Sequence, residues 1–383
     1  MTPEQRQLTY PAASDLETKA KTKLPHFAWE YLDSGTGNET LVARNRQAFD
    51  AFQFTPRVLA GELAPDLSTD IFGHTYAVPF GIAPVGLSGL MWPQAEHFLA
   101  ESAARNNLPY CLSMVANETP ETVGPKAAGN GWFQLYPPTE RHYVDDLLQR
   151  AWDSNMRTLV VTLDVPVGSR RERQLRAGLS VPPRKDLKTI YRAAKRPHWS
   201  LSTLAYGEPR FKTLEQYFDT SNVASAAQLI GHVINGFHDW ELISYIRKQW
   251  QGPLVLKGIM HAEDARQAID AGADAIQVSN HGGRQFDGSP AAIHALPGLV
   301  EAINGEAKVF YDSGLRGGLD IMRALALGAD FCFLGRPFLQ SVAALQEAGP
   351  DHLIDILQAD LINNMMQIGC NDIKQLHQHL TQV

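Results

Sequence analysis

The sequence predicts an α/β fold, a (β/α)8 TIM barrel that follows an N-terminal helical segment and carries a long insertion after its fourth strand. From residue 78 onward, eight short apolar or β-branched runs alternate with segments of helical periodicity, which indicates a parallel sheet wound by helices. Polar residues close most of these runs, as the active-site face of a barrel requires. A chain of 383 residues that is 44% hydrophobic can bury such a core, so a disordered chain is excluded.

The eight runs are the expected strands of the barrel. They span residues 78–85, 110–114, 132–136, 159–165, 254–259, 275–281, 309–313 and 331–334. Helical periodicity marks residues 95–106, 144–154, 262–271 and 319–327. A Rossmann-type fold would need a glycine fingerprint after an early strand, but residues 35–40 lack the third glycine and follow a helical pattern. The barrel is therefore preferred.

The connection between the fourth and fifth expected strands is far longer than the others. We expect one domain, residues 1–383, with residues 178–236 as an inserted segment. Residues 178–212 have a net charge of +6, in a chain whose net charge is −7. Basic and aromatic side chains together suit a membrane surface, and a mobile lid or a subunit contact is the alternative. These side chains are Arg184, Lys185, Lys188, Arg192, Lys195, Arg196, Arg210 and Lys212, with Tyr191, Trp199, Tyr206 and Phe211.

Several classes of protein are disfavoured. The mildly acidic chain has no overall basic face for nucleic acid. No signal peptide or membrane-spanning stretch is recognisable, and three widely separated cysteines suggest reduced thiols, so we expect a cytoplasmic protein. Neither metal-ligand spacing nor a G-x-S-x-G elbow is found, and no metal is expected.

Polar residues at the ends of the expected strands are the candidate site. Because the carboxyl ends of parallel strands open on one face of a barrel, these side chains should meet there. They are Ser113, Gln134, Tyr136, Thr162, Asp164, Lys257, Ser279, His281, Asp312, Gly335 and Arg336.

Residues 279–287 give the clearest indication of the chemistry of the site. His281 is a natural general base because imidazole titrates near neutral pH. Arg284 offers a planar fork for a substrate carboxylate. Asp164, at another strand end, could orient His281 and stabilise its protonated form. The stretch predicts acid/base chemistry on a carboxylate-bearing molecule.

Residues 312–318 and Gly335 with Arg336 follow the last two expected strands. Barrels commonly bind a phosphate at this place through loop amides and a helix N-terminus, and two arginines strengthen the prediction of a cofactor phosphate. Lys257, at the end of the fifth strand, would lie under the ring system of that cofactor. A fixed cation there stabilises the negative charge that develops on reduction.

These motifs closely resemble the FMN-dependent L-2-hydroxy acid oxidase and dehydrogenase family. The resemblance runs over nearly the whole chain, and its most specific parts are residues 279–285 and 312–316. The stretches that look most like the (S)-mandelate and membrane L-lactate dehydrogenase branch are residues 86–93, 197–201 and 367–370. The weaker matching stretches are residues 24–31, 83–86, 133–136, 162–164 and 257–258.

The resemblance implies an FMN enzyme that oxidises an L-2-hydroxy acid to the 2-oxo acid. His281, paired with Asp164, would take a proton either from Cα or from the hydroxyl as hydride leaves, and the sequence does not choose between these routes. The implied catalytic and substrate-binding residues are His281, Asp164, Tyr136, Tyr31, Arg284 and Arg171. The implied FMN-binding residues are Ala83, Pro84, Gly86, Ser113, Gln134, Thr162, Lys257, Ser279, Asp312, Gly314, Arg316, Gly335 and Arg336.

Two departures from the oxidases refine this expectation. Val115 stands where glycolate oxidase has a tryptophan, which leaves room for a medium or aromatic side chain such as that of mandelate. Gly86 stands where oxidases usually have alanine, which favours an acceptor other than oxygen. We therefore expect a quinone-type acceptor at the inner face of the cytoplasmic membrane, and a homotetramer as in many relatives. A soluble, peroxide-producing oxidase is the nearest alternative, and an FMN-barrel isomerase and a surface-binding scaffold are more distant ones.

Overall fold

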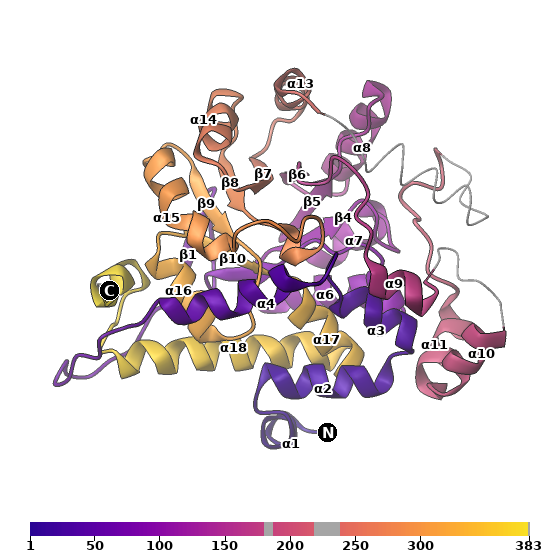
Figure 1. Ribbon diagram of the computed structural model, residues 1–383, viewed down its shortest axis with the longest axis horizontal. Coiled ribbons are helices and arrows are strands. Elements are labelled where there is room, and N and C mark those ends of the chain that lie inside the picture. Colours follow the sequence, from indigo (N-terminus) through magenta and orange to yellow (C-terminus); the bar gives the residue numbers. More distant parts are fainter. Residues whose placement is uncertain (180–186, 218–237, 382–383) are drawn as a thin grey trace.

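Eight parallel strands close into a barrel in a computed structural model that describes residues 1–179, 187–217 and 238–381 (Figure 1). Around the barrel the order is β10-β3-β4-β5-β6-β7-β8-β9, which confirms the predicted (β/α)8 fold. Each strand overlaps one expected run, but most end earlier. Tyr136 and Asp164 therefore lie in the following loops, and His281 begins the short 3-10 helix η3 (His281–Gly283). The strands are β3 (Phe80–Ile82), β4 (Tyr110–Ser113), β5 (Gly131–Leu135), β6 (Thr158–Thr162), β7 (Leu254–Ile259), β8 (Ala275–Val278), β9 (Lys308–Tyr311) and β10 (Phe331–Leu334).

Helices surround the barrel, and the N-terminal helical segment is confirmed. It consists of α1 (Pro3–Thr9), α2 (Ala13–Lys23), α3 (His26–Asp33) and α4 (Thr40–Gln47). The four periodic segments form α6 (Ala95–Arg105), α8 (Arg141–Asp153), α14 (Ala262–Asp270) and α16 (Gly318–Ala326). Helix α2 packs mainly against α17 (Arg336–Leu345), and the long α18 (Ala348–Gln367) runs beside them along one side of the barrel (Figure 1). Other helical elements are η1 (Ala48–Ala51), α5 (Ser88–Met91), α7 (Pro120–Ala127), α9 (Glu172–Ala177), α13 (Trp240–Gln249), η3 (His281–Gly283), α15 (Ala292–Ile303), α17 (Arg336–Leu345), α18 (Ala348–Gln367) and η4 (Ile373–His379).

The interior of the barrel changes from apolar to polar along the strands. Side chains of a strand alternate between its two faces, so residues two apart both point inward. At the amino ends the inward layer is apolar, and one step further along most strands it is polar. The inward pairs are Cys111 and Ser113, Trp132 and Gln134, Val160 and Thr162, Val255 and Lys257, Ala275 and Gln277, and Phe310 and Asp312.

A small hairpin closes the amino end of the barrel. It pairs β1 (Thr69–Ile71) with β2 (His74–Tyr76) in antiparallel register. Tyr76 packs edge-on to Trp132, whose indole Nε1 donates to the Tyr76 hydroxyl at 3.1 Å. Since this end is filled with aromatic side chains, ligands must enter from the carboxyl end.

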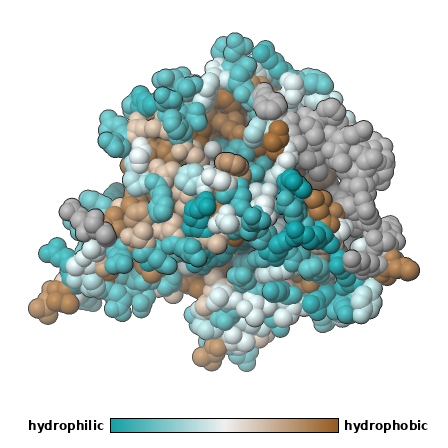
Figure 2. All heavy atoms as spheres, viewed as in Figure 1, coloured by the Kyte–Doolittle hydropathy of each residue, from teal (hydrophilic) through white to brown (hydrophobic). Residues whose placement is uncertain are grey.

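The described part of the expected insertion contains the α10–α11 hairpin, formed by α10 (Leu187–Ala194) and α11 (Pro197–Tyr206). Large apolar side chains are exposed on it, and hydrophobic surface lies over α10 in Figure 2. These exposed side chains are Leu187, Ile190, Tyr191, Leu201, Leu204 and Tyr206. Arg184 and Lys185 of the predicted basic segment lie outside the described residues, as do residues 218–236 of the expected insertion.

The four aromatic residues of this segment, expected to suit a membrane surface, differ in exposure. Trp199 and Phe211 are buried, whereas Tyr191 and Tyr206 are exposed. The Trp199 indole donates to the Leu90 carbonyl at 3.0 Å and packs edge-on against Phe27, which fixes α11 to the barrel. Within the described residues, no helix is both long and apolar enough to cross a bilayer.

Candidate active site

A cavity of about 520 Å³ opens at the carboxyl ends of the strands. All of the site residues expected from the sequence line it except Ser113, Asp164 and Ser279. One wall is polar and arginine-rich. The lining also includes apolar side chains, and six of them are named here the apolar wall: Leu87, Val115, Val165, Leu175, Leu179 and Phe211.

The three residues that do not line the cavity each bond to one that does. Ser113 Oγ donates to Gln134 Oε1 at 2.7 Å. Ser279 Oγ accepts from Lys257 Nζ at 2.9 Å and donates to Asp312 Oδ1 at 2.6 Å. These hydroxyls therefore fix the orientation of the groups that face the cavity.

His281 and Asp164 form a paired acid/base unit. His281 Nδ1 lies 2.9 Å from Asp164 Oδ1, which leaves the other ring nitrogen available to a bound molecule. Burial lowers the pKa of His281 below its ordinary value of 6.5, and Asp164 opposes this only in part. Burial alone would raise the pKa of Asp164, but its contact with His281 and the Lys257 charge hold it below its ordinary value. At neutral pH the pair therefore consists of a neutral imidazole and an ionised carboxylate.

The backbone around His281 is in the left-handed region. His281 has φ +57°, and Gly282 and Gly283 follow with φ +63° and +77°. A Cβ on Gly283 would lie 2.9 Å from Val42 Cγ2, so only glycine fits there. A left-handed histidine is uncommon and persists only where its surroundings determine its conformation. The loop holds the imidazole at the cavity wall.

Partly buried arginines dominate the polar wall. Arg284 Nη1 donates to the carbonyls of Tyr31 and Ser34, each at 2.9 Å. Arg336 donates to Leu32, Ser34 and Gly282 at 3.0–3.1 Å. Burial and then repulsion from Arg171 lower the pKa of Arg284 to about 10, and burial with neighbouring arginines also lowers the pKa of Arg336. Because crowded buried cations repel one another, this wall favours bound anions.

The floor of the cavity also contains a buried polar atom without a hydrogen-bond partner. Gln134 Nε2 is buried and has no hydrogen-bond partner within the described part of the chain. Lys257 Nζ lies 3.2 Å from Asp312 Oδ2, and both side chains are nearly buried. Burial lowers the pKa of Lys257, but Asp312 and Asp164 raise it by more, so the ammonium stays charged. A planar polar group lying over this floor would satisfy the amide and meet a fixed cation.

A family described as FMN-dependent dehydrogenase matches residues 20–383. The chain belongs to this family. It is 37% identical over 369 residues to an L-lactate dehydrogenase of Ectopseudomonas mendocina, covering 95% of this chain and 97% of the relative. An L-lactate dehydrogenase of Vibrio parahaemolyticus is 36% identical over 367 residues, with coverage of 95% and 97%.

Solved structures agree with this assignment. The crystal structure of the monotopic membrane protein (S)-mandelate dehydrogenase superposes with a TM-score of 0.92 and 33% identity, over 97% of this chain and 99% of that one. A mandelate oxidase superposes with a TM-score of 0.81 and 30% identity, over 97% and 98% of the two chains. This chain is an FMN-dependent 2-hydroxy acid dehydrogenase.

The cavity of this dehydrogenase fits FMN. The unpaired Gln134 amide and the Lys257 ammonium suit a polar ring system. Arg316 and Arg336 lie with the Gly314 loop on the cavity wall and suit a phosphate. Gly314 has φ +93°, and a Cβ there would lie 2.7 Å from the Asn45 carbonyl, so the loop requires glycine.

Of the apolar wall, only Val115 was expected from the sequence to lie beside the substrate, and the residues that support Arg171 were not expected. Arg171 Nη2 donates to Gln285 Oε1 at 2.7 Å, and its Nε donates to Ser169 Oγ at 2.8 Å. Gln285 lies within the motif of residues 279–285, but this residue was given no role in the sequence analysis. Leu179 carries no recognisable signal, because its apolar side chain resembles that of any core residue. Phe211 was expected with the aromatic residues of the basic segment, but it is buried and lines the cavity.

Gly86→Ala is expected to slow FMN reduction by a factor of roughly ten to one hundred. A Cβ at this position would lie 2.8 Å from Val115 Cγ2 and 3.5 Å from the Tyr31 hydroxyl, so the cavity wall must shift. Anaerobic stopped-flow absorbance measures the rate. Combining Gly86→Ala with Val115→Ala removes the clashing methyl group and should restore most of the reduction rate. Val115→Ala alone is the control. A double variant as slow as Gly86→Ala would contradict this explanation.

Proposed function

We propose that this dehydrogenase oxidises an L-2-hydroxy acid with a medium or aromatic side chain to the 2-oxo acid, and that residues 1–383 act as one domain. The observation that carries the proposal is that the His281–Asp164 pair and the Arg284 guanidinium share one cavity. A base and a carboxylate-binding fork are the two groups that this reaction requires from the protein.

Each residue has a proposed role. His281 takes a proton from the substrate, and Asp164 stabilises the imidazolium that results. Arg284 and Arg171 bind the substrate carboxylate, assisted by the Tyr31 hydroxyl. Tyr136 donates to the substrate hydroxyl.

FMN, when bound, supplies the two-electron acceptor. The residues proposed to hold its ring are Ala83, Pro84, Gly86, Gln134, Thr162 and Lys257, with Ser113 and Ser279 orienting them. Asp312 would hold the ribityl hydroxyls. Gly314, Arg316, Gly335 and Arg336 would hold the phosphate.

The apolar wall supports a medium or aromatic substrate side chain. Val115, Leu179 and Phe211 offer a surface on which a hydrocarbon group loses contact with water. The names of two relatives, L-lactate dehydrogenase and (S)-mandelate dehydrogenase, refer to substrates with a small methyl and a larger phenyl side chain.

The first test is anaerobic mixing of the FMN-loaded protein with (S)- and (R)-2-hydroxy acids from glycolate to mandelate. We expect the (S) acids to bleach the flavin absorbance, with the fastest rates for medium or aromatic side chains. Slow recovery when air is admitted supports the dehydrogenase, whereas fast recovery with peroxide indicates an oxidase. A flavin that no 2-hydroxy acid bleaches would refute the proposed reaction.

We also propose that the acceptor is a quinone, and that the protein lies peripherally on the inner face of the cytoplasmic membrane as a homotetramer. The exposed apolar side chains of the α10–α11 hairpin support membrane contact. A relative described as a monotopic membrane protein supports it further.

Sedimentation with anionic liposomes tests the membrane contact. Leu201 and Leu204 are 66% and 82% exposed on α11, and replacing both by glutamate should release the protein from the vesicles. Leu59→Glu is the matched control, because Leu59 is 99% exposed but lies far along the chain from the hairpin. Equal binding by all variants would exclude the hairpin as the docking surface.

The pH dependence of kcat/KM reports on the His281–Asp164 pair. Only neutral imidazole accepts a proton, so activity should rise with pH through the pKa of His281, which burial places below 6.5. Asp164→Asn removes a charge that raises this pKa, so the acid limb should move to lower pH while the plateau falls by roughly 10²–10⁴. A limb that stays in place would mean that another group controls it.

A further inference from the structure

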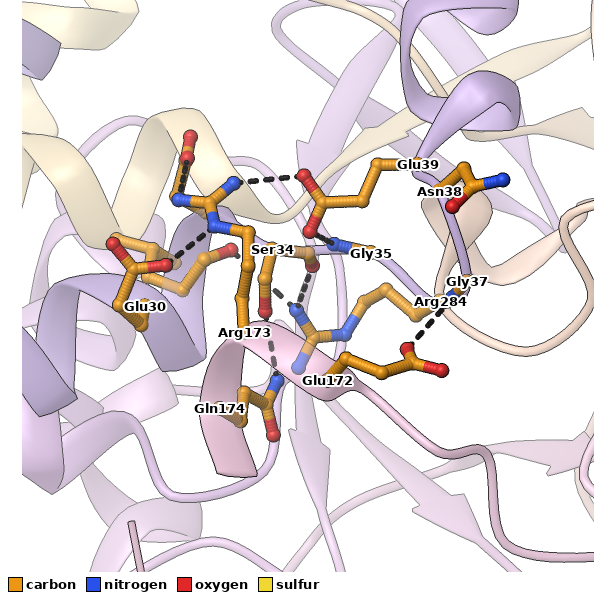
Figure 3. A network of polar contacts seen from close by, with 12 residues as sticks. Glu30, Ser34, Gly35, Gly37, Asn38, Glu39, Glu172, Arg173, Gln174 and Arg284 are labelled. Carbon is orange, nitrogen blue, oxygen red and sulfur yellow. Dashed lines mark hydrogen bonds and ion pairs between the residues drawn. The ribbon is translucent and has the colours of Figure 1, made fainter. Parts of the chain in front are cut away.

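Arg173, on the short helix α9, is the centre of a cluster of charged side chains beside the cavity (Figure 3). Its guanidinium bonds Glu30 Oε2 through Nε at 2.5 Å, Glu39 Oε2 through Nη1 at 2.8 Å and Asp33 Oδ2 through Nη2 at 2.8 Å. We name Arg173 with these three carboxylates the Arg173 cluster. All three carboxylates come from the end of α3 and the loop that follows it, more than 130 residues before Arg173 in the chain.

The segment that the Arg173 cluster holds is the one that supports the substrate-binding groups. Tyr31 lies between Glu30 and Asp33, and its hydroxyl donates to the Gly86 carbonyl at 2.8 Å. The Tyr31 and Ser34 carbonyls accept from Arg284. Movement of residues 30–39 would therefore displace both the tyrosine hydroxyl and the guanidinium.

Further bonds join the same two segments. Gln174 Nε2 donates to Ser34 Oγ at 3.1 Å, and Glu172 Oε2 accepts from the Gly37 amide at 3.0 Å (Figure 3). Glu39 uses its second oxygen to accept from the Gly35 amide at 3.0 Å. Three consecutive residues of α9 thus hold the loop, and Arg173 supplies the charged bonds among them.

The Arg173 cluster also balances charge. It holds three carboxylates against one guanidinium, close to the arginine-rich wall of the cavity. Burial lowers the pKa of Arg284, Arg316 and Arg336, and the Asp33 carboxylate opposes this lowering in each case. Without Arg173 the three carboxylates would repel one another, and the Asp33 carboxylate would no longer be held near the arginines of the cavity.

Direct contact with the substrate is not the role of the Arg173 cluster. Its four side chains are absent from the cavity wall formed by the described residues. We propose that Arg173 is a positioning residue that fixes residues 30–39 so that Arg284 and Tyr31 are in place to bind the substrate carboxylate. This inference rests on the proposed function.

Steady-state kinetics of Arg173→Gln test the proposal. We expect KM for the preferred (S)-2-hydroxy acid to rise roughly ten- to hundred-fold, since a small displacement of a binding group costs about that much. kcat should change by less than about threefold, because the His281–Asp164 pair is untouched. Arg266→Gln is the matched control, because Arg266 pairs with the exposed Glu306 away from the cavity and should leave KM unchanged.

A second readout separates positioning from general stability. The Kd of oxalate, titrated by the change in flavin absorbance, should rise in Arg173→Gln by the same factor as KM. In a double-mutant cycle with Arg284→Lys, the two losses should be strongly non-additive, since Arg173 acts through Arg284. Additive losses, or an unchanged oxalate Kd in a protein with only a lower Tm, would overturn the proposal.

Two more variants keep the test decisive if Arg173→Gln folds poorly. Arg173→Lys keeps the charge but cannot bond three carboxylates in one plane, so it should show a smaller rise in KM. Glu39→Gln removes one charged arm and should also raise KM. If both bind substrate like the natural chain, the proposal is wrong. Failure of the proposed function is distinguishable, because in that case the unaltered protein is not bleached by any 2-hydroxy acid.

Discussion

His281→Gln is expected to keep its flavin and to lose substrate reduction by a factor of about 10²–10⁴ or more. The variant retains a polar side chain of similar reach but no nitrogen that accepts a proton near neutral pH. The Asp164 carboxylate, 2.9 Å from the imidazole in the natural chain, loses the group that it orients. Anaerobic stopped-flow bleaching by an (S)-2-hydroxy acid measures the loss.

Two measurements complete this experiment. The flavin-to-protein absorbance ratio should equal that of the natural chain, which shows that the cavity is intact. His377→Gln is the control, because His377 is exposed on η4 and its side chain contacts only the Lys374 carbonyl among the described hydrogen bonds. Bleaching of His281→Gln at the natural rate would remove His281 from its proposed role.

Arg284→Lys is expected to weaken carboxylate binding by about 2–5 kcal/mol, or roughly 30- to 4000-fold in affinity. Lysine cannot both bond the Tyr31 and Ser34 carbonyls and present a planar fork to the substrate. KM, and the Kd of oxalate, measure the effect. FMN should be retained.

Arg316→Lys tests whether the arginine-rich wall has two separate tasks, with Arg284 binding the substrate carboxylate and Arg316 binding the FMN phosphate. We expect this variant to hold FMN less tightly on dialysis, because Arg316 lies with the phosphate loop, while the loaded fraction keeps its KM. If Arg284→Lys left the oxalate Kd unchanged, a different group would have to bind the carboxylate.

Much of the barrel and of the site could be predicted from local sequence patterns. Strand periodicity places Trp132 and Gln134 on the same inward face, and the switch from apolar to polar residues marks the open end. His281 and Asp164 each follow a strand of one parallel barrel, so they had to share its carboxyl end, and they meet at 2.9 Å. Family motifs supplied the remaining roles, which stay predictions until the variants are measured.

Tertiary structure decided how the supporting contacts are made. Arg173 meets Glu30 and Asp33 across more than 130 residues of chain, and no periodicity encodes such a pairing. Trp199 and Tyr191 look alike as aromatics of one basic segment, yet one packs against Phe27 and the other is exposed. The sequence by itself determined which residue types face the open end of the barrel, because strand geometry is local. The partners of each charged or aromatic side chain were decided by tertiary structure, because those contacts join segments that only the closed barrel brings together.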